Sequence, residues 1–131
     1  MPPKIRVLIA DDQRLFAEAL EAILSYDERI EVIGTARDGE EAIRLALAEK
    51  PDVILMDIAM PKIDGVEATK QIRRQGATPS VLMLTGSNAR GDVARAREAG
   101  ASAYVTKDRI ASQLLDAIVE LGGNDDKEPG K

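Results

Sequence analysis

The chain has 131 residues, a formal net charge of -5 at pH 7, and neither cysteine nor histidine. This length suits one domain with its own hydrophobic core, and the lack of cysteine excludes disulfide frameworks and thiol nucleophiles. Without histidine, any chemistry must use carboxylates, hydroxyls, lysine and a bound ion, while the acidic charge argues against direct nucleic-acid binding. No apolar run approaches the ~18 residues of a membrane span, so we expect a cytoplasmic protein without a membrane partner.

Short apolar runs alternate five times with segments of helical periodicity, which is typical of a parallel sheet covered by helices on both faces. The sequence predicts strands at residues 5–10, 30–35, 53–57, 80–85 and 102–106. In the first, third and fourth runs, residues at both odd and even positions are apolar. These strands should therefore be central, with both faces buried. The second run includes Glu31 and suits an edge of the sheet.

The helices carry their own start and stop signals. They are predicted at residues 13–25, after Asp38, at 65–74, at 89–99 and from Asp108 to Leu121. Asp38 and Glu41 have the spacing of a capping box, and Pro51 requires the second helix to have ended. Asp108 is predicted to cap the fifth helix. The first helix should bury one stripe of apolar residues: Phe16, Ala19, Leu20, Ile23 and Leu24.

The fourth predicted helix and the end of the chain carry weaker signals. Gly91 interrupts the helix, and Val93 is its only large apolar residue, so we expect it to be the least stable element. Residues 122–131 are polar and rich in glycine and charge, which predicts a flexible linker or tail after a single domain at 4–121.

Five polar side chains follow or end the predicted strands: Asp11, Asp12, Asp57, Thr85 and Lys107. Each alone has an ordinary structural explanation, as a helix cap, a strand residue or a solvated lysine. In an open parallel sheet, however, ligands bind beyond the carboxyl ends of the strands, and all five residues fall there. Three carboxylates brought together hold only around a cation.

This set of residues is chemically coherent. A hard divalent ion such as Mg²⁺ takes one or two carboxylates and keeps waters for a phosphoryl group. Asp57 would then act as the nucleophile, as carboxylates do in aspartyl-phosphate enzymes. Thr85 and Lys107 would bind the oxygens of the new phosphoryl group, by a hydroxyl hydrogen bond and by a point charge.

Four motifs lie at these strand ends: ADD at 10–12, LMDIAMPKIDG at 55–65, LTGS at 84–87 and YVTKD at 104–108. Together they resemble the receiver domain of two-component response regulators, and the resemblance covers residues 4–121. It implies an α/β, flavodoxin-like (βα)5 three-layer sandwich whose five-stranded parallel sheet has the strand order 2-1-3-4-5. It also implies that a sensor histidine kinase phosphorylates Asp57.

The resemblance also assigns metal ligands. Asp12 and Asp57 would bind Mg²⁺ (or Mn²⁺) directly, together with the Ala59 carbonyl, and Asp11 would help through a water molecule.

The same resemblance implies a switch. Thr85 and Lys107 match the family's signalling hydroxyl and lysine, and Tyr104 matches its switch aromatic. In that mechanism Thr85 moves to a phosphoryl oxygen, the tyrosine ring enters the vacated space, and the fourth helix shifts. From the residues alone, Tyr104 fits a half-buried strand aromatic equally well.

Small residues surround the expected phosphoryl position. Gly86 leaves room for the group, and Ala59 and Ser87 match the positions that in the family flank the water attacking the acyl phosphate. Alanine cannot orient that water. We therefore hypothesise slow hydrolysis, which asparagine, glutamate or lysine at position 59 would alter.

Lys107 is followed by Asp108, whereas many receivers have proline there, often after a cis peptide. A cis bond without proline costs ~3 kcal/mol, so we predict a trans bond. With DDQ at 11–13, this pair resembles receivers of regulators that carry a LuxR-type helix-turn-helix output. Such an output does not follow Leu121, so either a DNA-binding domain is missing from this chain, which we favour, or the receiver stands alone.

Other classes of protein use similar parts. A haloacid-dehalogenase-like phosphatase wants a second aspartate two residues after the first, where this chain has Ala59. A flavodoxin-like cofactor binder would place a phosphate loop after the first strand, where Asp11 and Asp12 would repel phosphate unless a metal intervened. The remaining alternative is a receiver-like scaffold that acts by dimerisation or partner docking without phosphorylation.

We therefore expect a signalling switch that catalyses only its own phosphorylation and dephosphorylation, not an enzyme with a separate substrate. The resemblance implies an output surface on the fourth helix, fifth strand and fifth helix. A homodimer could form through that surface or through the first and fifth helices.

Overall fold

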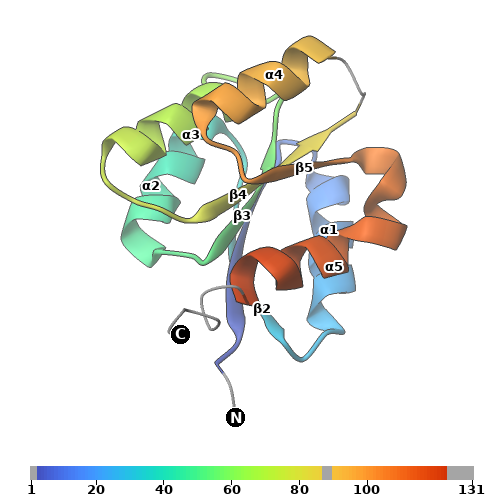
Figure 1. The fold of residues 1–131 in the computed structure, drawn as a ribbon. Coiled ribbons are helices and arrows are strands. Elements are labelled where there is room, and N and C mark those ends of the chain that lie inside the picture. Colours follow the sequence, from blue (N-terminus) through green and yellow to red (C-terminus); the bar gives the residue numbers. More distant parts are fainter. Residues whose placement is uncertain (1–2, 87–89, 124–131) are drawn as a thin grey trace, which may run out of the picture.

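The computed structural model of the protein describes residues 3–86 and 90–123, and Figure 1 shows its fold. Five parallel strands form one sheet in the order β2-β1-β3-β4-β5, which is the predicted flavodoxin-like order. The strands are β1 (Ile5–Ala10), β2 (Ile30–Ala36), β3 (Val53–Asp57), β4 (Ser80–Thr85) and β5 (Ala103–Thr106).

Helices cover both faces of this sheet, so the domain has three layers. They are α1 (Arg14–Ser25), α2 (Gly39–Glu49), α3 (Gly65–Arg74), α4 (Arg90–Ala99) and α5 (Ile110–Gly123), with a 3-10 turn, η1 (Lys107–Arg109), before α5. Helices α1 and α5 pack on one face, and α2, α3 and α4 pack on the other (Figure 1). No helix in the described ranges is long and apolar enough to cross a membrane.

The central strands are buried on both faces, as their sequences predict. On β3, Ile54 and Met56 pack toward α2, α3 and α4, while Val53 and Leu55 pack toward α1 and α5. This division follows from the alternation of side chains along a strand. The edge position of β2 is also confirmed, and its Glu31 is exposed.

A bulge aligns the end of β2 with the end of β1. The register runs from Val7 opposite Val32 to Leu8 opposite Gly34, so one residue of β2 is skipped. Beyond the bulge, Ala10 lies opposite Ala36, and the Asp11 N–H donates to the Ala36 carbonyl at 3.0 Å. The backbone that enters the acidic motif is therefore held by the sheet.

The predicted cap of α2 is confirmed. The Asp38 carboxylate accepts from the Glu41 N–H at 2.8 Å. The return bond of the predicted capping box goes to the residue before the cap, because the Glu41 carboxylate accepts from the Arg37 N–H at 2.8 Å. The helix ends at Lys50, which is in the left-handed region with φ 51°, directly before Pro51.

Helix α1 buries only part of the predicted stripe and is turned toward one flank of it. Leu20 and Leu24 are buried as expected, but the third buried residue is Ala17, whereas Ala19 is exposed and Ile23 is 39% exposed. The predicted stripe was wide enough to include both flanks of the helix. The helix is rotated so that the flank with Ala17 packs on the sheet.

The start of the fifth helix differs from the prediction. Asp108 lies inside η1 instead of capping α5, and Thr106 holds the position before that turn. The Lys107–Asp108 bond is trans, as predicted. Helix α5 then continues to Gly123, two residues past the predicted end at Leu121. A Cβ atom on Gly122 would collide with the Ile5 side chain, which would have to shift.

Helix α4 buries only small side chains among those described. Ala96 and Ala99 are buried, while Val93 is half-buried and Gly91 is exposed. That α4 is the least stable element stays a prediction, which this thin contact with the core supports.

Candidate functional site

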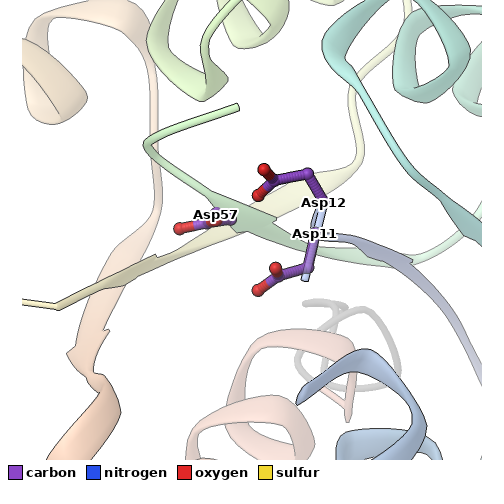
Figure 2. A group of neighbouring side chains, drawn as sticks. All are labelled: Asp11, Asp12 and Asp57. Carbon is purple, nitrogen blue, oxygen red and sulfur yellow. The ribbon is translucent and has the colours of Figure 1, made fainter. Parts of the chain in front are cut away.

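Three carboxylates meet at the carboxyl edge of the sheet (Figure 2). Asp11 and Asp12 follow β1, and Asp57 is the last residue of β3, which pairs directly with β1. One oxygen of each residue lies within 4.8 Å of the others. The predicted meeting of these three side chains is confirmed, and it follows from the register that places Ala10 opposite Met56.

The carboxylates differ in their surroundings. Asp11 is 1% exposed and Asp57 4% exposed, while Asp12 is open to solvent. One oxygen of Asp11 accepts from the Gln13 N–H at 2.8 Å. Its other oxygen, Oδ2, is buried and has no hydrogen-bond partner among the described residues. A buried carboxylate oxygen without a hydrogen bond costs free energy unless a cation compensates it.

The charge on Asp57 is also poorly compensated. Burial raises the pKa of this carboxyl to about 6, and the negative charge of Asp11 contributes to the rise. Lys107 and the Ala59 N–H lower the pKa but do not offset these effects. Three crowded carboxylates, one with a buried oxygen that accepts no hydrogen bond from a described residue and one with a raised pKa, form a donor set that fits a hard divalent cation.

Lys107 reaches into this cluster from the turn after β5. Its Nζ atom lies 3.4 Å from Asp11 Oδ2 and 3.6 Å from Asp57 Oδ1. It also donates to Gln13 Oε1 at 3.4 Å and lies 4.3 Å from the centroid of the Phe16 ring. The lysine therefore contacts two carboxylates, one amide and one aromatic ring.

Sequence reasoning missed Gln13 and Phe16 as parts of this site. Phe16 was assigned to the core stripe of the first helix, and it is indeed partly buried against the core. Gln13 directly follows the aspartate pair, a proximity that could have marked it as a neighbour of the site. Nothing in the sequence predicts that the Phe16 ring faces a lysine.

Thr85 ends β4 at the same edge of the sheet and is 3% exposed. It follows Leu84, which lies opposite Asp57 and whose carbonyl accepts from the Ile58 N–H at 3.1 Å. Thr85 also lies opposite Thr106, the residue before Lys107. All five predicted site residues thus lie at one edge.

Tyr104 lies on β5, two positions before Thr106, and is 40% exposed. It lines a groove of about 250 Å³ between α4 and β5. Other residues that line this groove are Val93, Ala96, Arg97, Ala101, Ser102 and Ala103. The ring is at the surface, beside the helix expected to shift.

The loop after Asp57 is tightly constrained. The Gly65 N–H donates to the Ile58 carbonyl at 2.8 Å, and a Cβ atom on Gly65 would collide with the Asp57 carbonyl oxygen. Ala59 is exposed. At Gly86, an added Cβ would meet no described atom within 4 Å, consistent with open space beside Thr85. Ser87 lies outside the described residues.

The fold and this acidic edge define a flavodoxin-like receiver, a class of signalling domain. Residues 7–119 match the family model of the response regulator receiver domain, and the chain belongs to this family. It is 46% identical over 114 residues to the transcriptional regulatory protein LiaR of Bacillus subtilis (strain 168), an alignment that covers 87% of this chain and 54% of LiaR. The chain thus spans about half the length of the curated relatives it matches.

Solved structures of response regulators have the same fold as this chain. The receiver domain of NarL from Mycobacterium tuberculosis superposes with a TM-score of 0.89 at 31% identity, covering 93% of this chain and 98% of that one. A LuxR-family response regulator from Aurantimonas sp. SI85-9A1 gives a TM-score of 0.87 at 30% identity, covering 92% and 86%. The predicted likeness to LuxR-type receivers is therefore confirmed.

Proposed function

We propose that this domain is a phosphoacceptor switch that receives a phosphoryl group on Asp57 from a sensor histidine kinase. Receiver domains as a class interact with such kinases and bind Mg²⁺ at an acidic pocket. The observation that carries the proposal is the position of the Asp57 carboxylate, which lies beside two further carboxylates and within 3.6 Å of the Lys107 ammonium.

In this proposal Asp11, Asp12 and Asp57 hold Mg²⁺ (or Mn²⁺), with the Ala59 carbonyl as a further ligand. The bound ion would supply positive charge that neutralises the carboxylates and polarises the phosphoryl oxygens. Support for this assignment comes from the buried Asp11 oxygen, whose one ion-pair partner among the described residues is the Lys107 ammonium at 3.4 Å, and from the raised pKa of Asp57.

The proposed chemistry is a phosphoryl transfer. A carboxylate oxygen of Asp57 attacks the phosphorus of the donor, the new O–P bond forms, and the bond to the leaving group breaks. Lys107 donates to a phosphoryl oxygen as a fixed positive charge, and the Thr85 hydroxyl donates to another. Without a cation the pKa of Asp57 is about 6, and a bound divalent ion would favour the ionised, nucleophilic carboxylate.

The signal would leave the site through Thr85 and Tyr104. As Thr85 turns toward the phosphoryl group, the Tyr104 ring would move inward from the groove beside α4, and α4 would shift. The exposed ring and the small buried side chains of α4 support this sequence of events. The face made by α4, β5 and α5 would then pass the change to a partner or to a second copy of the chain.

We propose a DNA-binding output as the target of this face. The relatives named as transcriptional regulators are about twice as long as the matching region, and their names support transcription regulation as the role of the whole protein.

The lifetime of the acyl phosphate would be long. Ala59 is exposed and offers only a methyl group beside Asp57, so it cannot orient an attacking water. Gly86 and Ser87 would leave the phosphoryl group accessible. Asparagine, glutamate or lysine at position 59 should change the rate of dephosphorylation.

The proposal is tested by incubating the protein with acetyl phosphate and Mg²⁺ and measuring its intact mass. We expect the parent to gain one phosphoryl group, the Asp57→Asn variant to gain none, and EDTA to abolish the reaction. The Asp12→Asn variant should react slowly because it lacks one proposed metal ligand. An unmodified parent under these conditions would contradict the proposal and favour a scaffold that acts without phosphorylation.

A further inference from the structure

Phe16 is the only phenylalanine in the chain, and its ring lies against the candidate site. The residue is in the first turn of α1, and the centroid of its ring is 4.3 Å from Lys107 Nζ. It is partly buried against the apolar cluster that α1 and α5 form on the sheet, which includes Val105 and Leu114. Packing on this cluster holds the ring, while the ring offers its π face to the ammonium.

The polar contacts of Lys107 are too long to fix its position. Its distances to Asp11, Asp57 and Gln13 are 3.4, 3.6 and 3.4 Å. Charge-assisted hydrogen bonds between ammonium and carboxylate groups are typically about 2.7–2.9 Å. Because lysine carries its charge on a flexible four-carbon stem, these long contacts with described residues do not by themselves fix the ammonium.

The face of the Phe16 ring can hold the Lys107 ammonium in position, which the long polar contacts do not. The ring quadrupole attracts a cation within about 6 Å of the centroid, and the attraction does not require a directed hydrogen bond. The N–H groups of the lysine therefore remain available for Asp11, Asp57 and an incoming phosphoryl oxygen. The ring also shields one side of the ammonium from water, which strengthens its interaction with charges on the other side.

We propose that Phe16 is a positioning residue for phosphorylation of Asp57, whose ring holds the Lys107 ammonium beside the acceptor carboxylate before the phosphoryl group arrives. This inference rests on the proposed function of Asp57. Phe16 touches neither the phosphoryl group nor the metal, and it acts only through Lys107. The ring contributes alignment and takes no part in bond formation.

The first test compares two substitutions of similar size. Phe16→Leu keeps an apolar side chain but removes the π face, whereas Phe16→Tyr keeps the π face. At a fixed concentration of acetyl phosphate and saturating Mg²⁺, we expect Phe16→Leu to slow phosphorylation by about 2- to 30-fold. Phe16→Tyr should stay within about 2-fold of the parent.

Two control measurements separate positioning from a general packing defect. The affinity for Mg²⁺ alone, measured by titration calorimetry without phosphodonor, should be the same in both variants. The urea midpoint should not follow the order of the phosphorylation rates. Equal losses of rate in the tyrosine and leucine variants, accompanied by weaker Mg²⁺ binding, would overturn the inference and assign Phe16 a packing role only.

The second test changes the electronics of the ring and little of its size. Because Phe16 is the only phenylalanine, growth on fluorinated phenylalanines labels this position alone. Each added fluorine weakens the negative face of the ring, so the phosphorylation rate should fall progressively from phenylalanine through 4-fluoro- to 3,4,5-trifluorophenylalanine. A rate that does not depend on fluorination would overturn the inference.

The same label gives a readout that does not depend on phosphorylation. The ¹⁹F resonance of 4-fluorophenylalanine at position 16 should shift in Lys107→Met and much less in Lys107→Arg, which keeps the cation. An unshifted resonance in Lys107→Met would count against the contact itself. A parent that is not phosphorylated would instead remove the proposed function, and this inference with it.

Discussion

Arg95 on α4 donates a hydrogen bond to Asp64, with 2.9 Å between Arg95 Nη2 and Asp64 Oδ2. Asp64 is also the N-cap of α3, because its other oxygen accepts from the Glu67 N–H at 2.8 Å. The next residue, Gly65, packs against the backbone of Asp57. One side chain of α4 is therefore joined to the segment that fixes the acceptor.

The two contacts of Asp64 should contribute unequally to stability. We expect Asp64→Ala to lower the free energy of unfolding by about 1 kcal/mol, because a helix loses its cap. Arg95→Met should cost less than about 1 kcal/mol, since the side chains of this ion pair are 50% and 34% exposed. Urea unfolding of both variants measures the difference, with Arg44→Met on α2 as the control for an ordinary surface pair. A larger loss in Arg95→Met than in Asp64→Ala would contradict this expectation.

The effect of Asp64 should also depend on pH. Burial raises the pKa of Asp64, but the Glu67 N–H and Arg95 together outweigh burial and leave the pKa below its usual value. A carboxyl with a lowered pKa in the folded state stabilises the fold above its unfolded pKa, and this contribution is lost as the pH falls. The difference between the parent and Asp64→Ala should therefore shrink below about pH 4.

The pH dependence of Asp57 should have the opposite sign. Its pKa is about 6 in the fold, against 3.8 for an ordinary aspartate, so the protonated form stabilises the fold below pH 3.8 and this contribution is lost as the pH rises through 6. At a pH of about 7 to 8 without metal, we expect Asp57→Asn to be more stable than the parent by about 1–3 kcal/mol. Near a pH of about 4 the two should be about equally stable.

Urea unfolding in EDTA across this pH range measures that difference. Saturating Mg²⁺ provides the control, because a bound cation stabilises the ionised carboxylate and should reduce the advantage of the asparagine variant. An Asp57→Asn variant that is less stable than the parent at a pH of about 8 in EDTA would show that the charge is better compensated than the geometry suggests.

The acidic edge could be predicted from the sequence because it depends only on recognising two buried strands and on their parallel pairing. Once β1 and β3 are recognised as buried neighbours, their registered ends must bring Asp11 and Asp57 together. The Asp38 cap was equally local, since it depends on residues within one turn. Both features follow from backbone geometry without knowledge of side-chain packing.

The features that escaped prediction depend on how a helix sits on the sheet. Whether Ala17 or Ile23 of α1 is buried depends on a rotation of the helix that its wide apolar stripe does not define. The same rotation brings Phe16 to Lys107, more than ninety residues away in the chain. Asp108 was misplaced because a 3-10 turn entered before α5, and the sequence before that helix permits either arrangement.

Mg²⁺ should stabilise the folded domain through the three carboxylates. A ligand at about ten times its dissociation constant raises the free energy of unfolding by about 1.4 kcal/mol. We expect thermal unfolding of the parent to shift upward with added Mg²⁺ and the shift to be reduced in Asp12→Asn and Asp57→Asn. NaCl at equal ionic strength controls for screening. A shift that is the same in the parent and in both variants would place the effect outside this cluster.

The same glycine-to-alanine substitution should have opposite effects at two helix starts. At Gly65, the first residue of α3, a Cβ atom would collide with the Asp57 carbonyl oxygen and lie 2.9 Å from Met56 Cγ. At Gly91, the second residue of α4, it would meet no described atom within 4 Å. We expect Gly65→Ala to lower the free energy of unfolding by about 1–3 kcal/mol and to slow phosphorylation, because the acceptor is displaced. Gly91→Ala should raise it by about 0.5–1 kcal/mol through helix propensity. Urea unfolding and intact-mass kinetics measure both variants, which introduce the same methyl group. A similar loss of stability in the two would mean that close packing against Asp57 is not what requires glycine at position 65.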